Sequence, residues 1–145
     1  MQVIPFGSAV GQNPMGMPVA FSNALGLDLA EIRRLIWVSG QLAFDDNGRL
    51  VGAGDIRVQT EQCLANIRRA LEQLGGTLAD VVQVTVYVRD LSELAAIHAV
   101  RLRHFSDPLP TSTLVAVSGF VHPDALIEIS AVAALRTLSA AGDHA

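Results

Sequence analysis

The first third of the chain carries the residue patterns of β-strands and tight turns. Val19–Leu25 fits a short strand, and Leu35–Leu42 is rich in strand-forming residues. An Asn47-Gly48 pair then predicts a hairpin turn, after which Leu50-Val51 returns as a short strand. Residues 1–18 hold no charged side chain and several prolines, and they are predicted to be a loose N-terminal arm.

The apolar period changes to that of a helix after Asp55. One helix face is formed by Cys63, Leu64, Ile67, Leu71 and Leu74, and the helix ends at Gly75-Gly76. A second helix, ending before Pro108, is marked by a stripe of Leu91, Leu94, His98, Leu102 and Phe105.

Three further strands are predicted at Val81–Val88, Ser112–Ser118 and Leu126–Leu135. The last two are expected to be adjacent, so that Ser112 and Glu128 could face one cleft. In the first of them, alternation puts Val82, Val84, Val86 and Val88 on one face. The order β-β-β-α-β-α-β-β predicts an α+β fold, with two helices packed on one face of the sheet. Several strands are apolar on both faces, so the second face is predicted to pack against a partner.

The composition adds a reason to expect self-association. The chain has 145 residues without a linker-like segment, so a single domain over residues 1–145 is predicted. Hydrophobic residues make up 50% and charged residues 17%, and the mean hydropathy of +0.39 is high for a small monomer. Prolines and glycines interrupt the uncharged N-terminal stretch, so no membrane span is expected. With no basic N-terminal region and only Cys63 as a thiol, the sequence predicts a reduced, cytoplasmic protein.

Charge and motifs exclude several classes of function. The net charge is −4 and no run of Lys or Arg occurs, which argues against a nucleic-acid partner. Phosphate-binding loops, a nucleophile elbow and a metalloprotease helix are absent from the sequence. The four histidines are scattered, so neither a metal site nor a cofactor is predicted.

Glu128 is the most informative charged residue. It lies between Ile127 and Ile129, and strand alternation places it on the face opposite these two side chains. A carboxylate in so apolar a strand either faces water at an edge or lines a partly buried pocket, where function concentrates.

Several short motifs occur together and in a fixed order. They are Ser39-Gly40-Gln41, Gln59-Thr60 with Asn66, Asp80–Tyr87 with Asp90-Leu91, and Pro110–Thr113 followed by Ile127-Glu128-Ile129. In these motifs, from about Phe21 to Leu135, the chain resembles the RidA family of enamine and imine deaminases, also called the YjgF or L-PSP endoribonuclease family.

The resemblance implies a chorismate-mutase-like α+β protomer and a homotrimer in which three sheets form a central barrel. It also implies small-molecule clefts between neighbouring subunits. In such a cleft an arginine clamps the substrate carboxylate, and the glutamate of Ile-Glu-Ile places a water that attacks the imine carbon. The products are ammonia and a 2-oxo acid.

Carried over residue by residue, the resemblance gives a partial site. Glu128 matches the family glutamate, and Ser39 and Gly40 match the Ser-Gly of the cleft wall. Phe21 stands where many members have a tyrosine, so the ring is kept without its hydroxyl. His98 stands where many members have an asparagine.

The departure with the largest consequence is at Ser112, where the family has its arginine. A serine cannot neutralise a carboxylate, so binding of 2-imino acids is expected to weaken at least about tenfold. Leu114 replaces a cysteine found in some members, which makes the cleft more apolar. The chain therefore resembles an arginine-lacking branch, and a non-catalytic trimeric binding or sensing protein is the alternative to a deaminase.

Other residues have plainer predicted roles. His98 is either a core histidine or, beside Glu128 of a neighbouring subunit, half of an acid–base pair that partly compensates for the missing arginine. Cys63 is predicted to be a buried structural thiol, and Trp37 a core or trimer-interface residue. The pairs Arg33-Arg34, Arg68-Arg69 and Arg101/Arg103 are predicted to lie on solvated faces, with Arg101 as the one that could approach a cleft.

Overall fold

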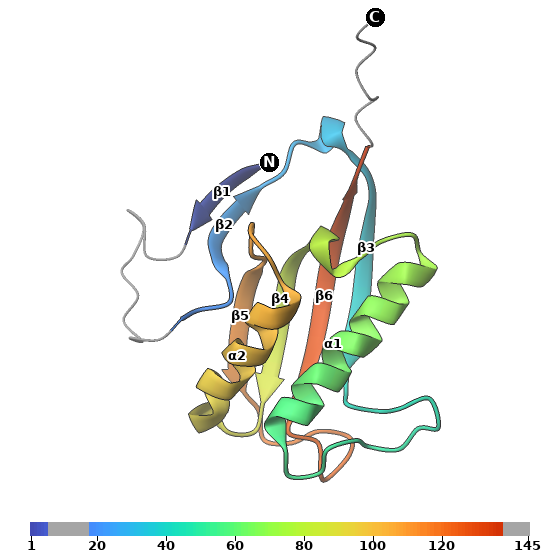
Figure 1. The fold of residues 1–145 in the computed structure, drawn as a ribbon, viewed down its shortest axis with the longest axis vertical. Coiled ribbons are helices and arrows are strands. Elements are labelled where there is room, and N and C mark those ends of the chain that lie inside the picture. Colours follow the sequence, from blue (N-terminus) through green and yellow to red (C-terminus); the bar gives the residue numbers. More distant parts are fainter. Residues whose placement is uncertain (6–17, 138–145) are drawn as a thin grey trace, which may run out of the picture.

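The fold was analysed in a computed structural model that describes residues 1–5 and 18–137. Its six-stranded mixed sheet has the order β1-β2-β5-β4-β6-β3 (Figure 1). The strands are β1 (Gln2–Pro5), β2 (Ser22–Gly26), β3 (Ile32–Gln41), β4 (Val81–Val88), β5 (Thr111–Ala116) and β6 (Ile127–Arg136). The helices are α1 (Ile56–Gln73) and α2 (Leu94–His104), with short 3-10 turns η1 (Leu29–Glu31), η2 (Leu78–Asp80) and η3 (Leu91–Glu93).

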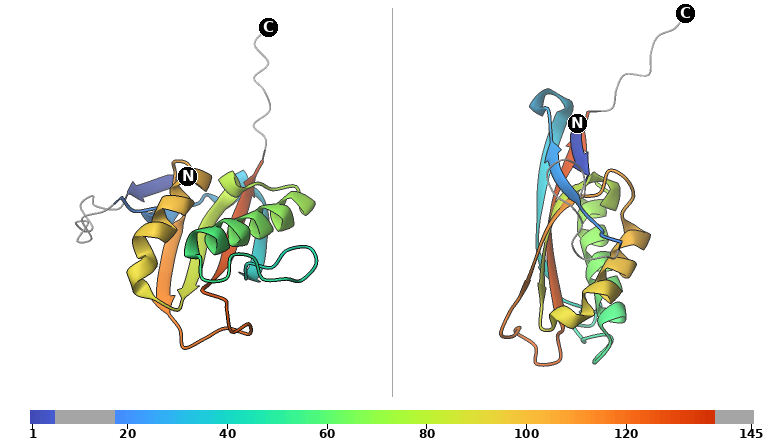
Figure 2. Two further views of the ribbon diagram at one scale, coloured as in Figure 1. Left: turned by 60° about the horizontal axis from the view of Figure 1, so that its bottom comes forward. Right: turned by 90° about the vertical axis from the view of Figure 1, so that its left-hand side faces the viewer.

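Both α-helices lie on the same face of the sheet, as the edge-on view in Figure 2 shows. The core lies between this face and the helices, and α1 supplies Cys63, Leu64, Ile67 and Leu71 to it. Asp55 begins α1 by accepting hydrogen bonds from the amides of Arg57 and Val58. The predicted α+β fold with two helices on one face is therefore confirmed. None of the described helices has the length and apolar composition that crossing a membrane requires.

The register of the central strand β4 with β6 decides which of its valines are buried. Its Val84, Val86 and Val88 point into the core, as predicted. The pairing with β6 shifts between Val81 and Gln83, so Val81 is buried in place of Val82. Such an irregularity turns the following residues to the other face of the sheet.

The face of the sheet away from the helices carries exposed apolar side chains. Trp37 is 70% exposed, and Leu35 and Val115 are 40% and 42% exposed. Trp37 pairs with Val132 across β3 and β6 on this open face. The expectation that Trp37 belongs to the protomer core is wrong, while its place in a subunit interface stays a prediction.

Two predictions in the first third of the chain, the loose N-terminal arm and the short strand Leu50-Val51, also differ from the structure. Gln2–Pro5 is not loose but forms the edge strand β1, antiparallel to β2. The remainder of the predicted arm up to residue 17 lies outside the described residues. Leu50-Val51 is no strand: only an isolated bridge joins Leu50 to Phe44. The predicted order of strands and helices is reproduced because β1 takes the place of that missing strand.

Candidate functional site

Glu128 lies on the open face of the sheet, near the start of β6. It lines a cavity of about 330 Å³ together with Gly40, Tyr87, Val117, Gly119, Phe120 and Ser130. We call this cavity the Glu128 pocket. Glu128 is only partly exposed there, so of the two positions predicted for it, an edge facing water and a partly buried pocket, the structure shows the second.

Gly40 allows the Glu128 side chain to lie against the backbone of β3. The pairing of β3 with β6 shifts between Val38 and Gln41, so that one extra residue, within Ser39-Gly40, is accommodated opposite Ser130. A Cβ atom on Gly40 would lie 1.8 Å from Oε1 of Glu128, so any side chain at this position would displace the carboxylate. Ser39 itself is exposed and does not line the cavity.

Two buried amides on α1 fix the chain segments on either side of this pocket. Gln59 donates to the carbonyls of Gly52 (3.1 Å) and Asp124 (2.9 Å) and accepts from the amide of Leu126 (2.8 Å). It thereby holds the residues that lead into β6 and Glu128.

Asn66, two turns further along α1, holds the segment that follows Gly40. Its amide donates to the carbonyls of Leu42 and Phe44, both at 3.0 Å. Sequence reasoning used Gln59 and Asn66 only as marks of a resemblance. Their seven-residue spacing, which puts both on one helix face, is the signal that could have assigned them this role.

Four other predicted site residues meet at a different place. Phe21, His98, Ser112 and Leu114 line a cavity of about 320 Å³ together with Leu91 and Leu94. We call it the His98 pocket. The rings of Phe21 and His98 meet edge to face, with centroids 6.0 Å apart. Hydrocarbon side chains dominate this lining, and Ser112 contributes a hydroxyl.

The two pockets open on opposite faces of the sheet. Ser112 is in register with the core residue Val84, and so faces the helices. Glu128 is in register with Tyr87, whose neighbours Val86 and Val88 point into the core. Since β4 separates β5 from β6, the prediction that Ser112 and Glu128 lie on adjacent strands is wrong. Within one protomer they do not share a cleft.

His98 is buried in the wall of its pocket, with 3% of its surface exposed. Burial lowers its pKa below 6.5, and the nearby positive charge of Arg101 lowers it further. A hydrogen bond to the backbone of Pro18 acts in the opposite direction. His98 is therefore neutral at pH 7, and its Nδ1 has no hydrogen-bond partner among the described residues.

Arg101 contradicts the prediction of a solvated face. It is 1% exposed, and burial lowers its pKa to about 10, so it stays charged at neutral pH. The buried face of α2 is formed by Ile97, His98, Val100 and Arg101 rather than by the predicted stripe, of which Leu91 and Leu102 are exposed. The arginines at 33, 34, 68, 69 and 103 are exposed as predicted.

Cys63 is fully buried, which confirms the predicted structural thiol. Burial raises its pKa to about 12, and the negative charge of Glu128 acts in the same direction. The thiol is therefore protonated and unreactive at neutral pH.

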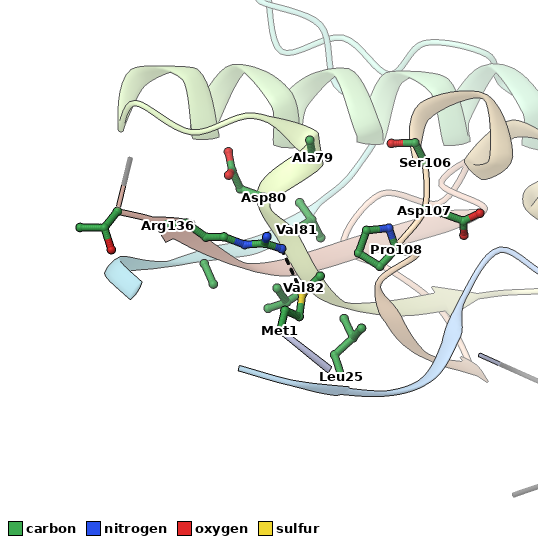
Figure 3. A pocket seen from close by; sticks show the side chains of 12 residues that line it. Met1, Leu25, Ala79, Asp80, Val81, Val82, Ser106, Asp107, Pro108 and Arg136 are labelled. Atoms are coloured by element: carbon green, nitrogen blue, oxygen red, sulfur yellow. Dashed lines mark hydrogen bonds between the residues drawn. The ribbon is translucent and has the colours of Figure 1, made fainter. Parts of the chain in front are cut away.

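A third cavity, of about 400 Å³, lies at the opposite end of β4 and β6 (Figure 3). It is lined by residues that include Asp80, Asp107 and Arg136, and Arg136 contacts the sulfur of Met1 at 3.2 Å. None of the predicted site residues borders it. Across the part of the chain that the structure describes, no three His, Cys, Asp or Glu side chains gather as a metal site would require.

Comparison with known proteins connects these residues to a family. The family profile described as Endoribonuclease L-PSP matches residues 19–135. A RutC family protein of Pyrococcus abyssi is 37% identical over 103 residues, which make up 71% of this chain and 80% of the relative.

Two solved structures are similar in fold as well as in sequence. YyfB of Yersinia pestis, a Rid family protein of unknown function, has a TM-score of 0.71 and 34% identity, covering 85% of this chain and 96% of its own. RidA of the Antarctic bacterium Psychrobacter sp. PAMC 21119 has a TM-score of 0.66 and 28% identity, covering 93% and 100%.

Proposed function

The chain belongs to the RidA (YjgF, endoribonuclease L-PSP) family, and we propose from this that it hydrolyses a small imine or enamine at clefts between the subunits of a homotrimer. The observation that carries the proposal is the position of Glu128. Its carboxylate lies against Gly40, in a pocket whose flanking segments are held by buried amides of α1.

The separation of the two pockets supports a site shared between subunits. One protomer presents Glu128 on the open face, and its neighbour would supply Phe21, His98, Ser112 and Leu114. The exposed Trp37 and Val115 give the open face the apolar surface that a stable subunit interface buries. Light scattering tests this step, and a stable monomer would contradict it.

In the proposed reaction the Glu128 carboxylate accepts a proton from water while the water oxygen attacks the imine carbon. The proton then passes to nitrogen, which gives a carbinolamine. When the hydroxyl proton of this intermediate is transferred to the same nitrogen, the carbon–nitrogen bond breaks, the carbon–oxygen double bond forms, and the products are a carbonyl compound and ammonia. Neutral His98 of the neighbouring subunit can accept and return a proton during these transfers. Ser112 supplies a neutral hydrogen bond, and Phe21 and Leu114 exclude water from one side of the substrate.

The test is the release of ammonia from imines generated in situ by an amino-acid oxidase. Acceleration by the wild type is expected, with a loss of about 100-fold or more in Glu128→Gln, because general acid–base groups contribute on that scale. Glu72→Gln is the matched control, since Glu72 is an exposed residue of α1 outside both pockets. Full acceleration by Glu128→Gln would contradict the proposed role.

A non-catalytic binding function is the alternative, and the apolar lining of the His98 pocket favours it. Phe21, Leu91, Leu94 and Leu114 suit a small neutral or aromatic ligand. Binding of such a ligand without turnover of any imine would support this alternative. The ribonuclease activity in the family's older name fits poorly with a net charge of −4 and no basic stripe.

A further inference from the structure

The Glu128 pocket carries a negative charge that no lining residue balances. Glu128 is the only carboxylate in the lining, and neither Arg nor Lys is part of it. Among the described residues, Glu128 takes part in no ion pair, and none donates a hydrogen bond to its carboxylate. A partly buried carboxylate without a counter-charge favours a positively charged ligand.

The positive charges of the protomer lie elsewhere. All ten basic side chains of the chain are arginines, and the structure describes each of them. Arg89, two positions after Tyr87, donates to the carbonyl of Pro123 at 2.6 Å. The lining of the His98 pocket, which a neighbouring subunit would bring to the cleft, likewise contains no arginine. A counter-charge for Glu128 is therefore assigned to the ligand.

Tyr87 stands beside Glu128 on the open face. The two residues are directly opposite each other in the antiparallel pairing of β4 with β6, so their side chains are neighbours. Gly40 lies on the other side of β6, in β3, and the Glu128 carboxylate lies against it. The pocket therefore has the carboxylate towards β3 and the ring of Tyr87 towards β4.

Phe120 adds a second aromatic ring from the loop between β5 and β6. This loop is held on both sides of Phe120: the amide of Val117 donates to the carbonyl of Val88 at 2.9 Å, and Arg89 holds Pro123. An organic cation beside an aromatic ring gains cation–π attraction in addition to its ion pair with a carboxylate. The pocket thus combines two features that recognise a cation.

We propose that the Glu128 pocket binds a small organic cation, with an amidinium, iminium or ammonium group at the Glu128 carboxylate and the rings of Tyr87 and Phe120 beside it. A carboxylate has two oxygen atoms, so one can pair with the cation while the other accepts a proton from water. The inference rests on the proposed function and narrows its substrate to an imine that carries a positive charge.

The experiment uses three flat ligands of similar shape and different charge. At neutral pH benzamidinium is positive, benzamide is uncharged and benzoate is negative, and each is titrated calorimetrically into the full chain. Wild type is expected to bind benzamidinium at least about tenfold more tightly than benzamide, and benzoate most weakly, because charge-assisted hydrogen bonds are about twice as strong as neutral ones. Equal affinities for the three ligands, or the reverse order, would overturn the inference.

Two variants separate the charge from the aromatic ring. Glu128→Gln is expected to weaken benzamidinium binding at least about tenfold and to leave benzamide unchanged, with the exposed Glu72→Gln as its control. Phe120→Leu is expected to weaken benzamidinium binding about threefold. Its control is Val121→Ala, since Val121 is 91% exposed and does not line the pocket. A folded Glu128→Gln that still prefers benzamidinium to benzamide would overturn the inference.

A measurement on the wild type alone decides the question if a variant fails to fold. Tyr87 is the only tyrosine of the chain, so labelling tyrosine with ¹³C gives one set of ring signals. These signals are expected to shift when benzamidinium is added and to stay in place with benzoate at the same concentration. Unmoved signals at saturating benzamidinium would place the cation elsewhere and overturn the inference.

The inference and the proposed function fail in different ways. Glu128-dependent hydrolysis of imines by a wild type that binds all three ligands equally overturns the inference and leaves the deaminase in place. Binding that prefers benzamidinium and depends on Glu128, without hydrolysis of any imine, supports the cation site and removes the deaminase.

Discussion

The Glu128 pocket and the His98 pocket of one protomer differ in how completely the buried polar groups around them are hydrogen-bonded. Around the Glu128 pocket the buried amides are fully used: Gln59 makes three hydrogen bonds and Asn66 fixes two carbonyls. In the His98 pocket, by contrast, Nδ1 of the lining residue His98 is buried without a hydrogen-bond partner among the described residues. Buried amides whose hydrogen bonds are all formed hold a reacting group in position, whereas a buried nitrogen atom without a partner is available to a ligand. This contrast agrees with the proposed function, in which the first pocket carries the chemistry and the second contacts the rest of the substrate.

The largest effect is expected from Gln59→Leu, which removes the hydrogen bonds that hold the segments beside the Glu128 pocket and so lowers the free energy of unfolding. It removes three hydrogen bonds and leaves the carbonyl of Asp124 and the amide of Leu126 unpaired, while the carbonyl of Gly52 still accepts from the amide of Asp55. At about 1–3 kcal/mol for each unsatisfied buried group, and with partial access to water, we expect a loss of about 3 kcal/mol. Urea unfolding measures it, with Gln73→Leu, an exposed change on the same helix, as the control. Equal stability of the two variants would show that Gln59 does not hold this frame.

The next effect tests whether the position of Glu128, and not only its presence, matters. Gly40→Ala places a Cβ 1.8 Å from Oε1 of Glu128, so the carboxylate must move. We expect a loss of about 30-fold in imine hydrolysis, because small displacements of a reacting group cost one to two orders of magnitude.

Gly119→Ala is the matched control for this prediction. It lies in the same pocket, and a Cβ there meets nothing within 4 Å. Stability should change little in either variant, since the atoms that a Cβ on Gly40 would meet, Oε1, Cδ and Cγ of Glu128, all belong to one flexible and partly exposed side chain. If the two alanine variants hydrolyse imines equally fast, close contact between Gly40 and Glu128 has no catalytic role.

The sequence was sufficient for features that depend on local periodicity. The strand Val81–Val88 and helix α1 follow directly from their patterns of apolar residues. The placement of Glu128 opposite Ile127 and Ile129 follows in the same way, because alternation along a strand is a local property.

Features that depend on distant pairing were missed. The order β5-β4-β6 separates Ser112 from Glu128, and no local pattern encodes that β4 inserts between strands that follow it in the chain. Arg101 was missed because the segment that covers it, around Ala20, lies far away in sequence. The shift in β3 at Ser39-Gly40 likewise depends on its partner strand β6.

The smallest expected effect is a pH dependence of stability caused by His98. Burial, together with the charge of Arg101, lowers its pKa in the folded protein. Above the ordinary histidine pKa of about 6.5 both states are neutral and nothing changes. As the pH falls below that value, His98 binds a proton in the unfolded chain but not in the folded chain. The free energy of unfolding therefore decreases, by at most about 1.4 kcal/mol per pH unit.

Thermal unfolding of wild type and His98→Asn between pH 7.5 and 5 measures this contribution, and the loss of stability on acidification should be smaller in the variant. NMR titration of the His98 ring checks the cause directly. A ring that titrates at or above 6.5 would mean that burial is offset by a partner for Nδ1. The buried polar groups of both pockets would then be hydrogen-bonded, and the difference drawn above between the two pockets would be lost. A ring that stays neutral well below 6.5 keeps that distinction, because Nδ1 of His98 is then buried without a partner, as the structure has it among the described residues.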